Sequence, residues 1–285
     1  MTEKSYTCKR FNEKDIQALS STMKIGLIAT VNDQGLPHLT LISSLMACSP
    51  IQMIWGQFTE GLSKSFIRQN PKAGFLVMSM DKHLWRGYAT FTHSAQSGAE
   101  FDKYNNQPMF RYNAYFGVHT VYYMDLESHS GEQILPMNKI IIAAVQSLIA
   151  RTLGKKMSRE RVLNTWTTDF INQLDGLKFI SYIREDGFPV IIPVIQAQCL
   201  DGEHVLFSTS AYRDDLASIP VGKTLAIFGM SLSMEDVLMR GIYQGIRHVG
   251  GVKCGIVGIN WVYNPMPPVP QQIYPEVPIE TITKF

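Results

Sequence analysis

Two stretches of eleven residues resemble each other although they lie about half a chain apart. The first is LIATVNDQGLP, residues 27–37, and the second is FISYIREDGFP, residues 179–189. In each, an apolar run rich in β-branched residues leads into a polar turn that ends in Gly-x-Pro. This pattern predicts a β-hairpin. From Gly35 to Gly187 the offset is 152 residues.

Two further pairs of segments follow in the same order. Residues 72–76 (KAGFL) resemble residues 223–227 (KTLAI) at an offset of 151, and residues 84–87 (LWRG) resemble residues 238–241 (LMRG) at an offset of 154. A nearly constant offset over three ordered anchors predicts a tandem duplication. The alternative is a coincidence between generic hairpin signals.

The rest of the first half alternates short apolar runs with turn signals. A short helix is expected over residues 12–22 with Asn12 as its cap, and another over residues 63–69. Strands are expected at residues 25–31, 39–45, 51–57, 73–79, 85–92 and 120–126. Short strands at this density favour a small closed antiparallel barrel over a parallel α/β sheet.

The middle of the chain has a helical period. A helix is expected over residues 136–153 and a second over residues 158–174, capped by Ser158. The apolar run at residues 140–150 is shorter than the roughly 20 residues that span a bilayer, so we expect it to be buried.

The predicted fold class is therefore mainly β, with two antiparallel Greek-key split β-barrels joined by a helical segment. The tail holds many prolines and is expected to lie extended, without regular structure. The expected domains are a first barrel at 1–132, a helical linker at 133–175, a diverged second barrel at 176–264 and a Pro-rich tail at 265–285.

Composition argues against several functions. The formal net charge is +2 and charged residues make up 18% of the chain, without the dense Lys/Arg stripe of a nucleic-acid-binding protein. The four cysteines are far apart, so they indicate no zinc site. The polar N-terminal residues do not resemble a secretory signal. We expect a cytoplasmic protein with neither a nucleic acid nor a membrane as partner.

The segment Ser63-Lys64-Ser65 is the strongest local signal for chemistry. A phosphate monoester needs a cation, hydroxyl donors and backbone N–H groups that converge on one point, and this helix start offers all three. On the local spacing alone, an ordinary surface helix with a solvated lysine is the better explanation.

An ordered series of motifs along the first half favours the phosphate site over an ordinary surface helix. The motifs are Gly35-Leu36-Pro37-His38-Leu39, Trp55-Gly56-Gln57, Ser63-Lys64, Asn70-Pro71, Phe75-Leu76-Val77 and Arg86-Gly87-Tyr88-Ala89. This series resembles the pyridoxamine 5′-phosphate oxidase-like, FMN-binding split-barrel superfamily, and most of all its small bacterial FMN-binding proteins. The resemblance covers residues 20–128 well and residues 176–262 weakly.

The resemblance implies a flavoprotein that binds FMN and acts as an oxidoreductase or electron carrier with a small-molecule or protein electron donor. It places FMN between two barrels, so the duplication would make one chain a pseudo-dimer; a homodimer is also compatible. It implies no particular catalytic residue. The implied cofactor contacts are the ring edge at Thr40, Leu41, Ile42 and Ser43, the ribityl or phosphate at Gly56 and Gln57, and the phosphate at Ser63, Lys64 and Ser65.

The sequence also departs from the family pattern. Thr40 and Ser63 stand where the oxidases carry basic residues, which argues against pyridoxamine phosphate as a substrate. The second copy has Tyr212-Arg213-Asp214-Asp215 at the position of the Ser-Lys-Ser segment. Two carboxylates would repel a phosphate, so we expect the second barrel to lack a full site.

Other functions remain open from the sequence. The chain could hold FMN, a deazaflavin or haem without turnover, and a haem ligand would be His119 or His38. It could also be a scaffold without a flavin.

Overall fold

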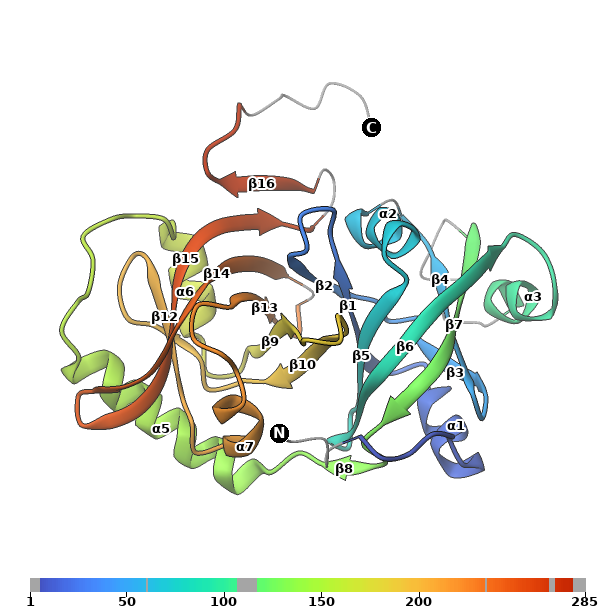
Figure 1. The fold of residues 1–285 in the computed structure, drawn as a ribbon, viewed down its shortest axis with the longest axis horizontal. Helices are drawn as coiled ribbons and strands as arrows, with labels where there is room; N and C mark the ends of the chain where they lie inside the picture. The colour runs from blue at the N-terminus through green and yellow to red at the C-terminus, as the bar shows by residue number, and fades with distance from the viewer. Residues whose placement is uncertain (1–5, 60, 107–116, 234, 267–269, 279–285) are drawn as a thin grey trace. The chain divides into compact units, whose positions relative to one another are not determined.

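The computed structural model describes residues 6–59, 61–106, 117–233, 235–266 and 270–278 (Figure 1). The chain divides into two compact units. Unit 1 comprises Met1–Pro136 and Ser181–Ile191, and unit 2 comprises Met137–Ile180 and Ile192–Phe285.

The first sheet is antiparallel and contains eight strands within the described residues. Its order is β2-β1-β5-β6-β7-β4-β3, and β8 pairs with β6. The strands are β1 (Lys24–Val31), β2 (Pro37–Leu41), β3 (Met46–Ser49), β4 (Gln52–Gln57), β5 (Lys72–Ser79), β6 (His83–Ala95), β7 (Thr120–His129) and β8 (Gln133–Ile134).

The second sheet repeats the strand order of the first. Its order is β10-β9-β13-β14-β15-β12-β11, and β16 pairs with β15. This match confirms the predicted duplication and the mainly β fold class. The strands are β9 (Leu177–Ile183), β10 (Pro189–Pro193), β11 (Gln198–Cys199), β12 (His204–Ser208), β13 (Thr224–Met230), β14 (Asp236–Val249), β15 (Val252–Asn264) and β16 (Gln271–Tyr274).

The two hairpin turns contain the same backbone hydrogen bonds. In the first, the Gly35 N–H donates to the Asn32 carbonyl at 3.0 Å; in the second, the Gly187 N–H donates to the Arg184 carbonyl at 3.0 Å. Both glycines have positive φ, 72° and 84°, a conformation that side chains with a Cβ rarely adopt. The same chemistry therefore sets both hairpins, at the offset of 152 residues seen in the sequence.

The expectation of a closed barrel is wrong for the described strands. The first sheet ends at β2 and β3, and no strand pairing among the described residues joins these two ends. The predicted strand at 39–45 ends at Leu41 instead. The Ile42 N–H still bonds to the Gly26 carbonyl on β1, but the Leu45 N–H bonds to the Ile42 carbonyl, a turn that takes the chain away from the ladder.

Unit 1 has an aromatic core with a capped helix at one end. Trp55, Phe75, Trp85 and Tyr122 are fully or almost fully buried. Helix α1 (Glu13–Leu19) begins at Asn12, as the sequence predicts, and its cap side chain accepts from the Asp15 N–H at 2.8 Å. A further helix that the sequence analysis did not predict, α3 (Ala99–Asn106), follows β6.

The long helix α5 (Met137–Leu153) lies where the sequence predicts it. Only one of its faces is buried, through Ile140, Ala143, Ser147 and Ala150. The expectation of a buried helix is therefore wrong for the other face. That face exposes Ile141, Ile142, Val145, Leu148, Ile149 and Leu153.

The second predicted helix of the linker begins later than expected. Helix α6 spans Thr165–Asn172, and its cap is Asn164, whose side chain accepts from the Thr167 N–H at 2.8 Å. Ser158 does not cap it: its N–H bonds to the side chain of Asp201, and its hydroxyl accepts from the Glu160 N–H.

Part of the Pro-rich tail is regular, which corrects another expectation. β16 pairs with β15, and the Trp261 indole N–H donates to Gln272 at 2.8 Å. Proline removes the donor only at its own position, so the four residues between the prolines can join the ladder. Within the described part of the chain, no helix is long and apolar enough to cross a membrane.

Candidate functional site

The predicted phosphate segment lies at the start of helix α2 (Leu62–Gln69), as expected. Ser63 is only 1% exposed and Lys64 only 7%, which contradicts the picture of a solvated surface lysine. The Lys64 Nζ atom folds back over the start of the helix, 3.7 Å from where a Cβ on Gly61 would lie. Gly61 has no side chain with which to cap the N–H groups of the first turn. The helix start therefore combines a buried hydroxyl, a buried ammonium and backbone donors.

A polar chain connects α2 to the ends of β4 and β7. Arg68 Nη2 donates to Tyr122 Oη at 2.9 Å, and Tyr122 Oη donates to Gln57 Oε1 at 3.0 Å. The Arg68 guanidinium also lies 5.4 Å from the centre of the Tyr122 ring. These bonds connect Gln57 to the last turn of α2. The sequence analysis missed Arg68, although its spacing of four residues from Lys64 puts both cations on one helix face.

Gly56 has a packing role in the fold. Its N–H donates to Ser44 Oγ at 3.0 Å, and the same hydroxyl donates to the Gly56 carbonyl at 3.0 Å. A Cβ at this position would come within 2.8 Å of Val118. Both backbone groups and the space over the glycine are therefore taken by the protein.

The predicted ring-edge residues lie on β2 and in the turn after it. The Ile42 N–H bonds to Gly26 at 2.7 Å, and in an antiparallel ladder such bonded pairs alternate with unbonded ones. Thr40, opposite Ile28, therefore faces β1 with its backbone groups, and Leu41 directs its own toward the open edge of the sheet. Ser43 lies in the turn.

Helix α2 lies beside this edge strand. The rings of His38 on β2 and Phe66 on α2 meet edge on, with centroids 5.2 Å apart. The ring-edge strand and the helix with Ser63 and Lys64 are thus brought together by packing. These contacts bring the edge of β2, the end of β4 and helix α2 together within unit 1.

The two candidate haem ligands have ordinary structural placements. His38 is buried beside Phe66. His119 is exposed, and its Nδ1 lies 2.8 Å from the Thr120 hydroxyl. Across the described ranges, no group of three His, Cys, Asp or Glu side chains could hold a metal ion.

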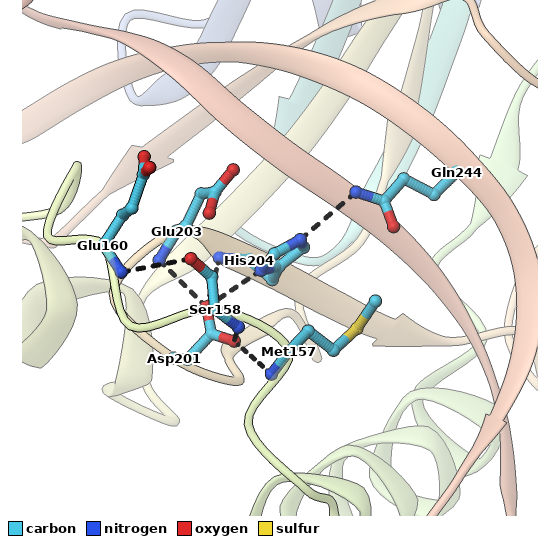
Figure 2. A network of polar contacts seen from close by, with 7 residues as sticks. All are labelled: Met157, Ser158, Glu160, Asp201, Glu203, His204 and Gln244. Carbon is cyan, nitrogen blue, oxygen red and sulfur yellow. Dashed lines mark hydrogen bonds and ion pairs between the residues drawn. The ribbon is translucent and has the colours of Figure 1, made fainter.

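Unit 2 contains a buried carboxylate that the sequence analysis did not identify (Figure 2). Asp201 Oδ2 accepts from the N–H groups of Met157 at 2.8 Å and Ser158 at 3.0 Å, and Oδ1 accepts from the Glu203 N–H at 2.9 Å. Desolvation raises the pKa of Asp201, but these backbone donors, together with His204, outweigh it and hold the pKa below its usual value. The carboxylate fixes the chain between α5 and α6.

His204 extends this network across the sheet. Its Nδ1 donates to Asp201 Oδ1 at 3.0 Å, and its Nε2 accepts from Gln244 Nε2 at 3.2 Å (Figure 2). Both ring nitrogens are therefore engaged within the fold. The bond between His204 and Gln244 links β12 to β14, so this network has a structural role.

Comparisons with known proteins find similar folds over parts of the chain. HupZ from Group A Streptococcus matches with 14% identity and a TM-score of 0.36, covering 44% of this chain and 98% of HupZ. An FMN-binding protein from Syntrophomonas wolfei subsp. wolfei matches with 15% identity and a TM-score of 0.34, covering 41% and 82%. General Stress Protein 26 from Bacillus anthracis matches with 12% identity and a TM-score of 0.32, covering 43% and 97%.

No protein-family model matches the sequence, and no curated protein matches it. Each of these three structures covers less than half of the chain.

Proposed function

We propose that unit 1 binds FMN non-covalently and that the chain is an FMN-dependent electron-transfer protein. The observation that supports this most is the burial of Ser63 and Lys64 at the start of α2. A surface lysine normally keeps its ammonium in water, and a buried lysine beside a buried serine suits a phosphate. The same residues are those that the family resemblance implies for the phosphate of FMN.

The residues fit FMN in a consistent order. Ser63, Lys64 and Ser65 would hold the phosphate, with Arg68 as a second cation on the same helix face. Gln57 would contact the ribityl chain, and the outward N–H of Leu41 would meet the ring edge. Bound FMN supplies the redox chemistry, while the chain binds it, orients it and sets its electrostatic surroundings.

The proposal extends to partners and assembly. The electron donor would be a small molecule or another protein. Because unit 2 repeats the strand order of unit 1, one chain would act as a pseudo-dimer, as in the family that its motifs resemble. We also propose that the protein is cytoplasmic.

A comparison of FMN with riboflavin tests the phosphate role. Both are titrated into the protein and the quenching of flavin fluorescence is followed. We expect FMN to bind at least tenfold more tightly, because a hydrogen bond to a charged group contributes about 1.5–3 kcal/mol. Equal affinities would show that Ser63 and Lys64 do not hold the phosphate.

A further inference from the structure

Unit 2 contains a pocket of about 740 Å³. This volume lies within the range of small-molecule sites, roughly 300–1,000 Å³. The pocket is bounded by α5, by the end of β12, by α7 (Arg213–Ala217) and by the hairpin of β14 and β15, which Figure 1 shows as a long twisted ribbon. Its lining residues are Gln146, Thr209, Ser210, Arg213, Ala217, Ile246, His248, Gly251, Val252 and Lys253.

The wall of this pocket is rich in donors and carries positive charge. Arg213 and Lys253 are cations, and the His248 ring can donate a hydrogen bond. Within the described residues, these three side chains have no hydrogen bond or ion pair, and none of the residues that line the pocket is acidic. Asp214 and Asp215, which the sequence analysis expected to repel a phosphate, do not line the pocket.

Gln146 adds a neutral donor to the same wall. Its Oε1 accepts from the hydroxyls of Ser208 at 2.6 Å and Ser210 at 2.5 Å. These two bonds fix the amide, so that its nitrogen keeps both N–H groups for another acceptor. The Thr209 N–H bonds to the Lys253 carbonyl at 3.4 Å, which joins two edges of the pocket.

The hairpin places two of the basic groups face to face. Gly250 and Gly251 both have positive φ, 55° and 83°, as a tight two-residue turn requires. His248 and Lys253 are therefore directly opposite each other on neighbouring strands. Side chains directly opposite each other on antiparallel strands have Cβ atoms about 4.5–5.5 Å apart, so these two basic groups can reach a single anion.

The residue before Arg213 is strained. Tyr212 has φ 53° and ψ 38°, a left-handed conformation that is uncommon for a residue with a large side chain. Such conformations cost about 1–3 kcal/mol and cluster at binding sites. The next residue, Arg213, lines the pocket.

We propose that this pocket is a second ligand site, which binds a small phosphorylated molecule. Arg213, Lys253 and His248 hold the phosphate, and Gln146 donates to it. The apolar wall of Ile246, Val252 and Ala217 receives the organic part. The site lies wholly within unit 2 and does not depend on FMN binding by unit 1.

Phenyl phosphate is a suitable probe, because it joins a phosphate dianion to a small apolar ring. The full-length protein is titrated with it by isothermal titration calorimetry, and with phenol as the uncharged control. We expect saturable binding of phenyl phosphate and none of phenol. Arg213→Gln and Lys253→Gln should each weaken binding about tenfold, which corresponds to the loss of one hydrogen bond to a charged group.

Arg247→Gln is the matched control, because Arg247 is exposed on the neighbouring position of β14 but does not line the pocket. It should leave the affinity within twofold. The proposal is wrong if phenyl phosphate does not bind to the unaltered protein. It is also wrong if Arg213→Gln and Lys253→Gln leave the affinity unchanged, or if Arg247→Gln weakens binding as much as Arg213→Gln. Thermal melting of each variant confirms that it is folded.

Discussion

The Lys64→Met variant is expected to bind FMN roughly 10- to 100-fold more weakly than the unaltered protein. Methionine keeps the apolar stem but removes the ammonium, and a hydrogen bond to a charged group contributes about 1.5–3 kcal/mol. Lys64 is almost fully buried at the start of α2, so little water could take over its role. Fluorescence titration gives the dissociation constant.

Two comparisons make this result specific. Lys103→Met removes a charge from the exposed α3 of the same unit and should leave FMN affinity within about twofold. Riboflavin affinity should be the same for Lys64→Met as for the unaltered protein, because riboflavin lacks the phosphate. Unchanged FMN affinity in Lys64→Met would place the phosphate elsewhere, and an equal loss for riboflavin would indicate general damage to the unit.

The Asp201→Asn variant is expected to lower the free energy of unfolding by about 2–4 kcal/mol at pH 7. An asparagine must present an NH₂ group where one carboxylate oxygen now accepts, so backbone donors such as the Met157 and Ser158 N–H groups lose their acceptor. Each buried donor left without a partner costs about 1–3 kcal/mol. Urea denaturation followed by circular dichroism measures the change.

The pH dependence of this effect has a defined sign. The pKa of Asp201 in the folded state lies below its usual value, so its contribution is fully present above the unfolded pKa of about 3.9. It is lost as the pH falls through the lower folded-state pKa. The stability difference between the unaltered protein and Asp201→Asn should therefore shrink below about pH 4.

Local exchange and a matched variant complete the test of Asp201. Amide exchange at Met157 and Ser158 should be at least tenfold faster in Asp201→Asn, because opening of this segment becomes easier. Asp33→Asn, at an exposed turn, should change stability by no more than about 0.5 kcal/mol. If Asp201→Asn were as stable as Asp33→Asn, the carboxylate would not fix this segment.

The sequence predicted the repeated parts of the fold best, because local rules determine them. The hairpins at Gly35 and Gly187 depend on a turn that needs a positive φ, and the cap at Asn12 depends on a local hydrogen bond. The predictions that were wrong concern segments whose structure depends on contacts between residues far apart in the chain. The helix predicted from Ser158 begins at Thr165, and the segment before it is held by Asp201, more than 40 residues away, which accepts from the Ser158 N–H.

The candidate site followed the same pattern. Ser63 and Lys64 could be proposed from motif order, but their burial could not, since it depends on how α2 packs beside β2. Arg68 could not be identified from the sequence, because it joins the site by a bond to Tyr122, which in turn bonds to Gln57, and these residues are far apart in the chain. Asp214 and Asp215 were expected to repel a phosphate because they follow Arg213 in the sequence. In the structure, neither of them lines the unit 2 pocket.

The most direct test of FMN binding by unit 1 is an absorption titration of the purified protein with FMN, followed by removal of the excess by gel filtration. We predict that the protein retains the flavin absorption bands with one FMN per chain, and that the Lys64→Met variant retains much less. A protein that emerges colourless, with the FMN in the small-molecule fractions, would contradict the proposed function.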